Sequence, residues 1–154
     1  MNLELDRLAK ELELSAPDNE RMRLEFGYAC IARVRHLLEE PPVVACLDGL
    51  GAYLAGNIDR ARFDALAVEA AQLANRHQGS KSIDGCGHAA VSASYAVAKA
   101  LAGKAREAAD YAAYATVYAQ GGSAAVADLD SFQAEHAWQA QHLASIARQH
   151  ASHA

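Results

Sequence analysis

The segment from Ser82 to His88 offers the clearest candidate for chemistry, because it places Cys86 between two glycines. A helix beginning here would present free amide groups and lower the pKa of a thiol at its N-terminus, so Cys86 could act as a nucleophile. Such a nucleophile needs an oriented base, and His88 at i+2 would point elsewhere on a regular helix. The sequence therefore favours a structural interpretation, in which Asp84 caps the helix, the glycines form the turn and His88 packs in the first turn.

A second set of polar side chains lies at helical spacing near the end of the chain. Four residues follow one another at i, i+3, i+4 and i+7, which is one helical face: Glu135, Trp138, Gln139 and His142. A tryptophan among hydrogen-bonding groups can anchor an interface or line a groove, but it is more often a core residue whose indole N–H meets a buried acceptor. We expect Arg33, His88, Glu135 and Trp138 to hold the fold as a polar network.

Three tyrosines repeat at spacings of three and four, namely Tyr111, Tyr114 and Tyr118. This spacing predicts a core stripe along one helix. Their hydroxyl groups need hydrogen-bond partners, so we expect this stripe to face a polar crevice.

The seven histidines and three cysteines do not form a recognisable metal site. No HExxH or ExxH pair is present, and Glu135 adjoins a histidine instead of sharing a helical face with it. Cys30, Cys46 and Cys86 are widely spaced without a CxxC pair, which argues against structural zinc and against a disulfide framework. We expect reduced thiols, no metal and no cofactor.

The apolar periodicity predicts seven helices that position these residues. They are expected at about 3–14, 17–40, 43–55, 60–77, 86–103, 104–120 and, with a break near 128–130, from 123 for nearly 30 residues. Pro41 and Pro42 are expected to end the second helix, since the residue before a proline avoids the helical region. Gly56 is expected to stop the third helix, and Asp59 to cap the fourth.

Composition supports an all-α fold in a single domain over residues 1–154. The chain is 52% hydrophobic, and 37 of its 154 residues are alanine, the strongest helix former. Alanine-lined faces allow two helices to approach closely: Ala89, Ala93, Ala96 and Ala100 on one, and Ala108, Ala112, Ala115 and Ala119 on the next. Short connections predict mostly antiparallel neighbours. The first helix could stand apart as an N-terminal arm, and residues 148–154 are expected to fray.

Charge and hydropathy narrow the classes of partner. The net charge is −5, and no run of Lys or Arg could neutralise several adjacent phosphates, so we expect no nucleic acid. No apolar stretch reaches the ~20 residues that span a bilayer, and the acidic first residues do not resemble a signal peptide. We therefore expect a soluble cytoplasmic protein with no membrane partner. Residues 1–48 carry ten acidic and six basic side chains, which suits a basic partner.

Several of these segments resemble a known family in both residue type and order. The matching positions are Ala29, Cys30, Ala32, Arg33, Val34, Leu37 and Glu39; Gly56 and Ile58; Gly87, His88, Ala89, Tyr95, Ala96, Lys99 and Ala100; and Glu135, Trp138, Gln139 and Leu143. Over about residues 26–147 the chain resembles bacterial immunity proteins of the helical immunity type five-like domain, which are associated with protection against toxins of neighbouring cells. The resemblance implies an all-α protein that binds a cognate toxin.

Three functions follow as hypotheses. The first is a non-enzymatic immunity protein that occludes a toxin domain, with charge steering by four acidic side chains: Glu11, Glu13, Asp18 and Glu20. The second is a small enzyme or ligand-binding bundle with a pocket lined by Cys86, His88, Tyr95, Glu135, Trp138 and His142. The third is a structural homo-oligomer, for instance a homodimer that uses the alanine and tyrosine faces.

Overall fold

The computed structural model describes residues 1–76 and 86–152, and the side chains of that part except those of residues 86 and 87. The described residues form seven α-helices: α1 (Leu3–Glu11), α2 (Glu20–Ala32), α3 (Pro41–Leu54), α4 (Arg60–Arg76), α5 (Cys86–Leu101), α6 (Ala105–Ala127) and α7 (Gln133–Ser152). Three short 3₁₀ helices join them: η1 (Pro17–Asn19), η2 (Arg35–Leu37) and η3 (Leu129–Phe132). This part of the chain has no strand, so the predicted all-α class is confirmed.

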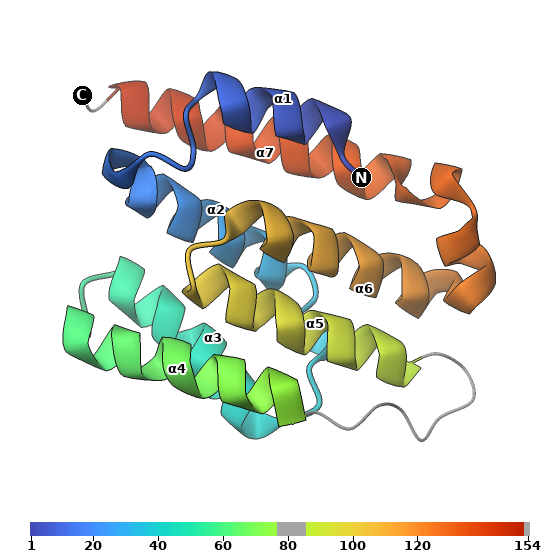
Figure 1. Ribbon diagram of the computed structural model, residues 1–154, viewed down its shortest axis with the longest axis horizontal. Helices are drawn as coiled ribbons and strands as arrows, with labels where there is room; N and C mark the ends of the chain where they lie inside the picture. The colour runs from blue at the N-terminus through green and yellow to red at the C-terminus, as the bar shows by residue number, and fades with distance from the viewer. Residues whose placement is uncertain (77–85, 153–154) are drawn as a thin grey trace.

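The helices stack in layers across the molecule (Figure 1). α1 and α7 lie side by side at one edge, α3 and α4 form a pair at the opposite edge, and α2, α5 and α6 lie between them. α2 is the central helix, since it packs against α3, α5, α6 and α7. Accordingly it buries side chains around its circumference: Met22, Leu24, Phe26, Cys30 and Ile31.

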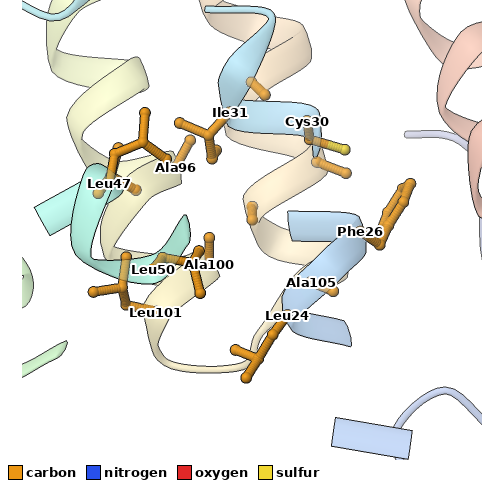
Figure 2. Close-up of a cluster of buried hydrophobic side chains, with 14 of the residues drawn as sticks. Leu24, Phe26, Cys30, Ile31, Leu47, Leu50, Ala96, Ala100, Leu101 and Ala105 are labelled. Carbon is orange, nitrogen blue, oxygen red and sulfur yellow. The ribbon is translucent and has the colours of Figure 1, made fainter. Parts of the chain in front are cut away.

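Small residues bring the central helices close together. Gly27 of α2 faces Ala100 of α5 so closely that an added Cβ would lie 3.1 Å from the Ala100 Cβ. Leu47 and Leu50 of α3 lie beside Ala100 in the same buried cluster (Figure 2). The alanine faces of α5 and α6 are buried as the sequence predicts, except that Ala119 is exposed.

Some helix ends lie where the sequence predicts them, and others do not. Gly56 adopts a φ of +80° after α3, and the Asp59 carboxylate caps α4 by accepting a 2.8 Å hydrogen bond from the Arg62 amide. The prediction that the second helix runs to residue 40 is wrong. α2 ends at Ala32, and Pro41 with its neighbour forms the first turn of α3, where a missing amide hydrogen costs nothing.

The C-terminal third bends twice. At Gly122 the backbone has φ 64° and ψ −153°, a conformation that only glycine adopts readily, and α6 kinks there and continues to Ala127. The Asp128 carboxylate then accepts a hydrogen bond of 3.1 Å from the Asp130 amide and starts η3, after which α7 begins. The chain bends at both predicted places, but α6 continues past its predicted end at residue 120, and the last helix has 20 residues instead of nearly 30.

The first helix packs on the last one. Leu5 and Ala9 of α1 are buried, and Asn2 caps α1 through a 3.1 Å hydrogen bond from the Leu5 amide to its side-chain oxygen. The Asn2 side-chain nitrogen also donates to the His136 carbonyl oxygen of α7 at 3.1 Å. α7 itself continues to Ser152. No helix among the described residues is long and apolar enough to span a bilayer.

Candidate functional site

The buried carboxylate of the fold belongs to Glu135, in the first turn of α7. Only 5% of Glu135 is exposed, and it accepts two hydrogen bonds of 2.8 Å from Nε and Nη2 of Arg33. Arg33 stands at the C-terminus of α2 with a side chain that is 40% exposed. The hydrogen bonds to Glu135 raise the pKa of Arg33 above its ordinary value, so Arg33 stays charged.

Trp138 and His142 extend this pair along α7. The Arg33 guanidinium carbon lies 4.0 Å from the centroid of the Trp138 ring, a cation–π contact, and the Trp138 and His142 rings stack with centroids 4.7 Å apart. Burial, and next the Arg33 charge, lower the pKa of His142. Four of the predicted polar residues therefore meet in one cluster, which we call the Arg33 cluster: Arg33, Glu135, Trp138 and His142.

Gln139 joins three helices from a fully buried position. Its side-chain nitrogen donates to the Ala109 carbonyl oxygen of α6 at 2.8 Å, and its side-chain oxygen accepts a 3.2 Å hydrogen bond from Asn2. The helical spacing places Gln139 on the Trp138 face, but it carries no signal for a partner 137 positions earlier in the chain. Both polar ends of this amide are thus satisfied within the core.

A pocket of about 430 Å³ opens beside the Arg33 cluster, between η2, α6 and α7. Arg33, His36, Thr116, Gln120 and Glu135 contribute its polar lining. Trp138 and His142 do not line it, so only part of the predicted polar network reaches solvent through this pocket.

His88 and Tyr95 lie elsewhere, on the outer seam of α5 and α6. His88 stacks with Tyr118 at 5.3 Å between ring centroids, and Tyr95 stacks with Tyr111 at 5.4 Å. One turn further along α5, Lys99 forms an ion pair with Glu107 of α6. Residues later in α5 thus contact residues that are earlier in α6 by the same number of positions, as in a regular antiparallel helix pair. Cys86 opens α5, but its side chain lies outside the described part of the structure.

The aromatic contacts continue from α6 to α7. Tyr118 meets Tyr114 at 4.9 Å, Tyr114 meets Phe132 at 6.3 Å, and Phe132 meets His136 at 5.4 Å between ring centroids. We call the whole set the aromatic row: His88, Tyr95, Tyr111, Tyr114, Tyr118, Phe132 and His136. Tyr111 and Tyr114 are 36% and 38% exposed. The tyrosine stripe thus lies on the surface and is not the core stripe that its spacing predicts.

Asp110 is exposed on α6, and His136 of the row is half-buried. Desolvation is the main cause that raises the pKa of Asp110, and Asp6 raises it further against the pull of the N-terminal ammonium, Arg106 and His136. Desolvation also lowers the pKa of His136. Both shifts favour the neutral forms, because a partly dry environment disfavours charge.

The four acidic residues predicted to steer a partner are in different situations. Glu11 pairs with Arg7 at 3.1 Å, and Glu20 pairs with Arg60, which lowers the pKa of Glu20. Glu13 and Asp18 are exposed and form no ion pair with another described residue. Two of the four carboxylates are therefore already neutralised by neighbours on the protein surface.

The two cysteines whose side chains are described are core residues. Cys30 and Cys46 are fully buried, and desolvation raises the pKa of both thiols, that of Cys46 to about 11. No group of three metal-ligating side chains is present among the described residues. Neither thiol is a nucleophile at neutral pH, because the thiolate is the reactive form.

Comparisons of the chain with protein-family models, with curated proteins and with solved structures find no match. The function of this protein is therefore inferred from its own residues and surfaces.

Proposed function

We propose that this protein is a binding protein of the toxin-immunity kind, which neutralises a partner protein by covering it with a preformed helical surface. The observation that carries the proposal is the aromatic row. Tyrosine offers a large, rigid contact area at a low cost in side-chain entropy, and it is enriched where protein interfaces gain most of their energy.

The scaffold beneath this surface supports inhibition by occlusion. α5 and α6 pack through buried alanines, and the buried amide of Gln139 and the Arg33–Glu135 pair tie α7 to α6 and α2. A surface on such a scaffold loses little freedom when it binds, which favours affinity. The resemblance to immunity proteins in order and type of residues points the same way.

Protection of cells is the direct test. The chain is produced in a laboratory bacterium together with a toxin domain encoded beside its gene, and survival is compared with that of cells carrying an empty vector. We expect protection, and a stable complex of the two purified proteins in size-exclusion chromatography. Survival equal to the vector control, or a gene flanked only by metabolic enzymes, would contradict the proposal.

The pocket beside Arg33 supports a second candidate, a protein that binds a small carboxylate. Arg33 uses Nε and Nη2 for Glu135, which leaves Nη1 for a ligand. Thermal melting with millimolar acetate and malonate tests it. A rise in Tm that the Arg33→Lys variant loses would favour this candidate, whereas an unchanged Tm leaves protein binding as the function.

A further inference from the structure

We propose that the aromatic row is the docking surface, and that its occupant is an arginine- or lysine-rich segment of the partner protein. This inference depends on the proposed function and adds to it the chemistry of the partner. The N-terminal acidic residues remain the alternative surface for such a segment.

The part of the chain that forms most of the row carries an excess of negative charge. Between Arg106 and Arg148 there is no Lys or Arg, although this stretch contains five carboxylates: Glu107, Asp110, Asp128, Asp130 and Glu135. The stretch supplies α6, η3 and most of α7, and thereby five of the seven rings. Glu135 is buried against Arg33, but the other four carboxylates lie at the surface and favour a cationic partner.

The Lys and Arg side chains nearest the row, Lys99 and Arg106, are already paired, and the N-terminal ammonium is the other cation that acts on Asp110. Lys99 binds Glu107 at 3.1 Å, and the Arg106 side chain donates to Asp6 at 2.8 Å. By contrast, Asp110, Asp128 and Asp130 form no ion pair with any residue that the structure describes. Three exposed carboxylates on α6 and η3, two of the elements that carry the row, are thus available to a partner's basic side chains.

A carboxylate and the exposed rings also lie close together along α6. Asp110 and Tyr114 are four residues apart on α6, so this carboxylate and this exposed ring share one strip of the helix. Tyr111, three residues before Tyr114, places the second exposed ring next to that strip. A guanidinium that lies over a ring while a carboxylate accepts its hydrogen bonds combines two favourable contacts. Arg33 already makes this combination inside the protein, over Trp138 and against Glu135.

A second copy of the chain fits the surface less well. In a two-fold dimer the same patch meets itself, so the row would bring its own carboxylates together without a Lys or Arg between them. An entirely apolar segment also fits less well, because it would bury the tyrosine hydroxyls and the carboxylates without partners.

The test uses a capped peptide of four Arg-Gly repeats as the probe, added to the ¹⁵N-labelled full-length protein. We expect amide shifts concentrated in residues 107–118 and 128–136. The Tyr111→Ala/Tyr114→Ala variant should bind about three- to tenfold more weakly, as expected for the loss of two exposed cation–π contacts. The ring-retaining Tyr111→Phe/Tyr114→Phe variant should bind like the wild type.

A matched pair of charge variants separates this surface from general attraction to an acidic protein. Two triple variants change the net charge equally: Asp110→Asn/Asp128→Asn/Asp130→Asn at the row and Glu11→Gln/Glu13→Gln/Asp18→Asn near the N-terminus. The first should weaken binding severalfold more than the second, and it retains the rings if the alanine variant fails to fold. Equal losses, a larger loss in the N-terminal variant, or shifts spread over the whole surface would overturn the inference. A dimer that the alanine variant converts to monomers would also overturn it.

The two proposals fail in different ways. If wild-type protein and the Tyr111→Ala/Tyr114→Ala variant protect cells equally, the protein is an immunity protein but the row is not its docking surface. If the wild type gives no protection and yet binds the peptide through the row, the toxin-immunity function fails while the surface assignment stands.

Discussion

Glu135 accepts both of its hydrogen bonds from Arg33, and the two residues are separated by 102 positions in the chain. One partner is buried and the other is 40% exposed, so the pair links the interior of α7 to the surface end of α2. A buried charge tolerates the loss of its partner poorly, because desolvation is then uncompensated.

The Arg33→Met variant should therefore be less stable than the wild type by about 2 kcal/mol, since the exposure of Arg33 keeps the effect below that of a fully buried pair. Arg33→Met/Glu135→Leu should recover most of this loss, because it removes the orphaned carboxylate. Urea denaturation followed by circular dichroism measures both. A double variant no more stable than the single one would show that the carboxylate is not the source of the cost.

Replacing Gln139 by alanine should cost about 3 kcal/mol of unfolding free energy. The change leaves the Ala109 carbonyl oxygen and the Asn2 side chain without their buried partner, and it creates a cavity. Gln141→Ala is the matched control, because Gln141 is exposed on the same helix. Equal midpoints of urea denaturation for the two variants would contradict the assigned role of Gln139.

His142 predicts a pH dependence. Its pKa in the folded protein is below the ordinary value, so the unfolded chain binds more protons and stability decreases as the pH is lowered. This contribution is complete above about pH 6.5 and is lost as the pH falls from there through the folded pKa. His142→Phe retains a ring on Trp138 without a titrating group. Between pH 7.5 and pH 5 this variant should lose less stability than the wild type, and equal losses would refute the prediction.

The buried thiols predict slow labelling. In the native protein, Cys30 and Cys46 should react with a maleimide at pH 7.5 at least about 100-fold more slowly than after unfolding in urea, because they are buried and mostly protonated. Peptide mass spectrometry assigns each site. A fast reaction in the native state would then belong to Cys86, and Cys86→Ser should abolish it. Rapid native labelling at Cys30 would contradict the burial described above.

Helix positions could be predicted from the sequence where a single local signal acted alone. Gly56 and Gly122 each adopt a positive φ at a predicted stop, and Asp59 caps the helix it was expected to cap. The end of α2 could not be predicted, because residues 33–40 have good helix formers and prolines fit equally after one helix or at the start of the next.

Tertiary partners explain the remaining differences. Spacing placed Glu135, Trp138 and His142 on one face, and the structure brings the expected Arg33 to them from the end of α2. His88 was grouped with them, but it lies on the outer seam with Tyr118. Helical spacing shows which residues share a face, and it carries no information about which neighbour, or whether solvent, lies opposite that face.

The pairing of α1 with α7 also limits when α1 can dock during protein synthesis. A ribosome releases Asn2 first and Gln139 more than a hundred residues later, yet the two side chains are bonded to each other in the folded protein. α1 therefore cannot dock on α7 and bury Leu5 and Ala9 there until α7 has been made. Docking of α1 on α7 must follow the synthesis of α7, and a chain whose translation stops before α7 leaves the apolar stripe of α1 exposed, where quality-control proteins can recognise it.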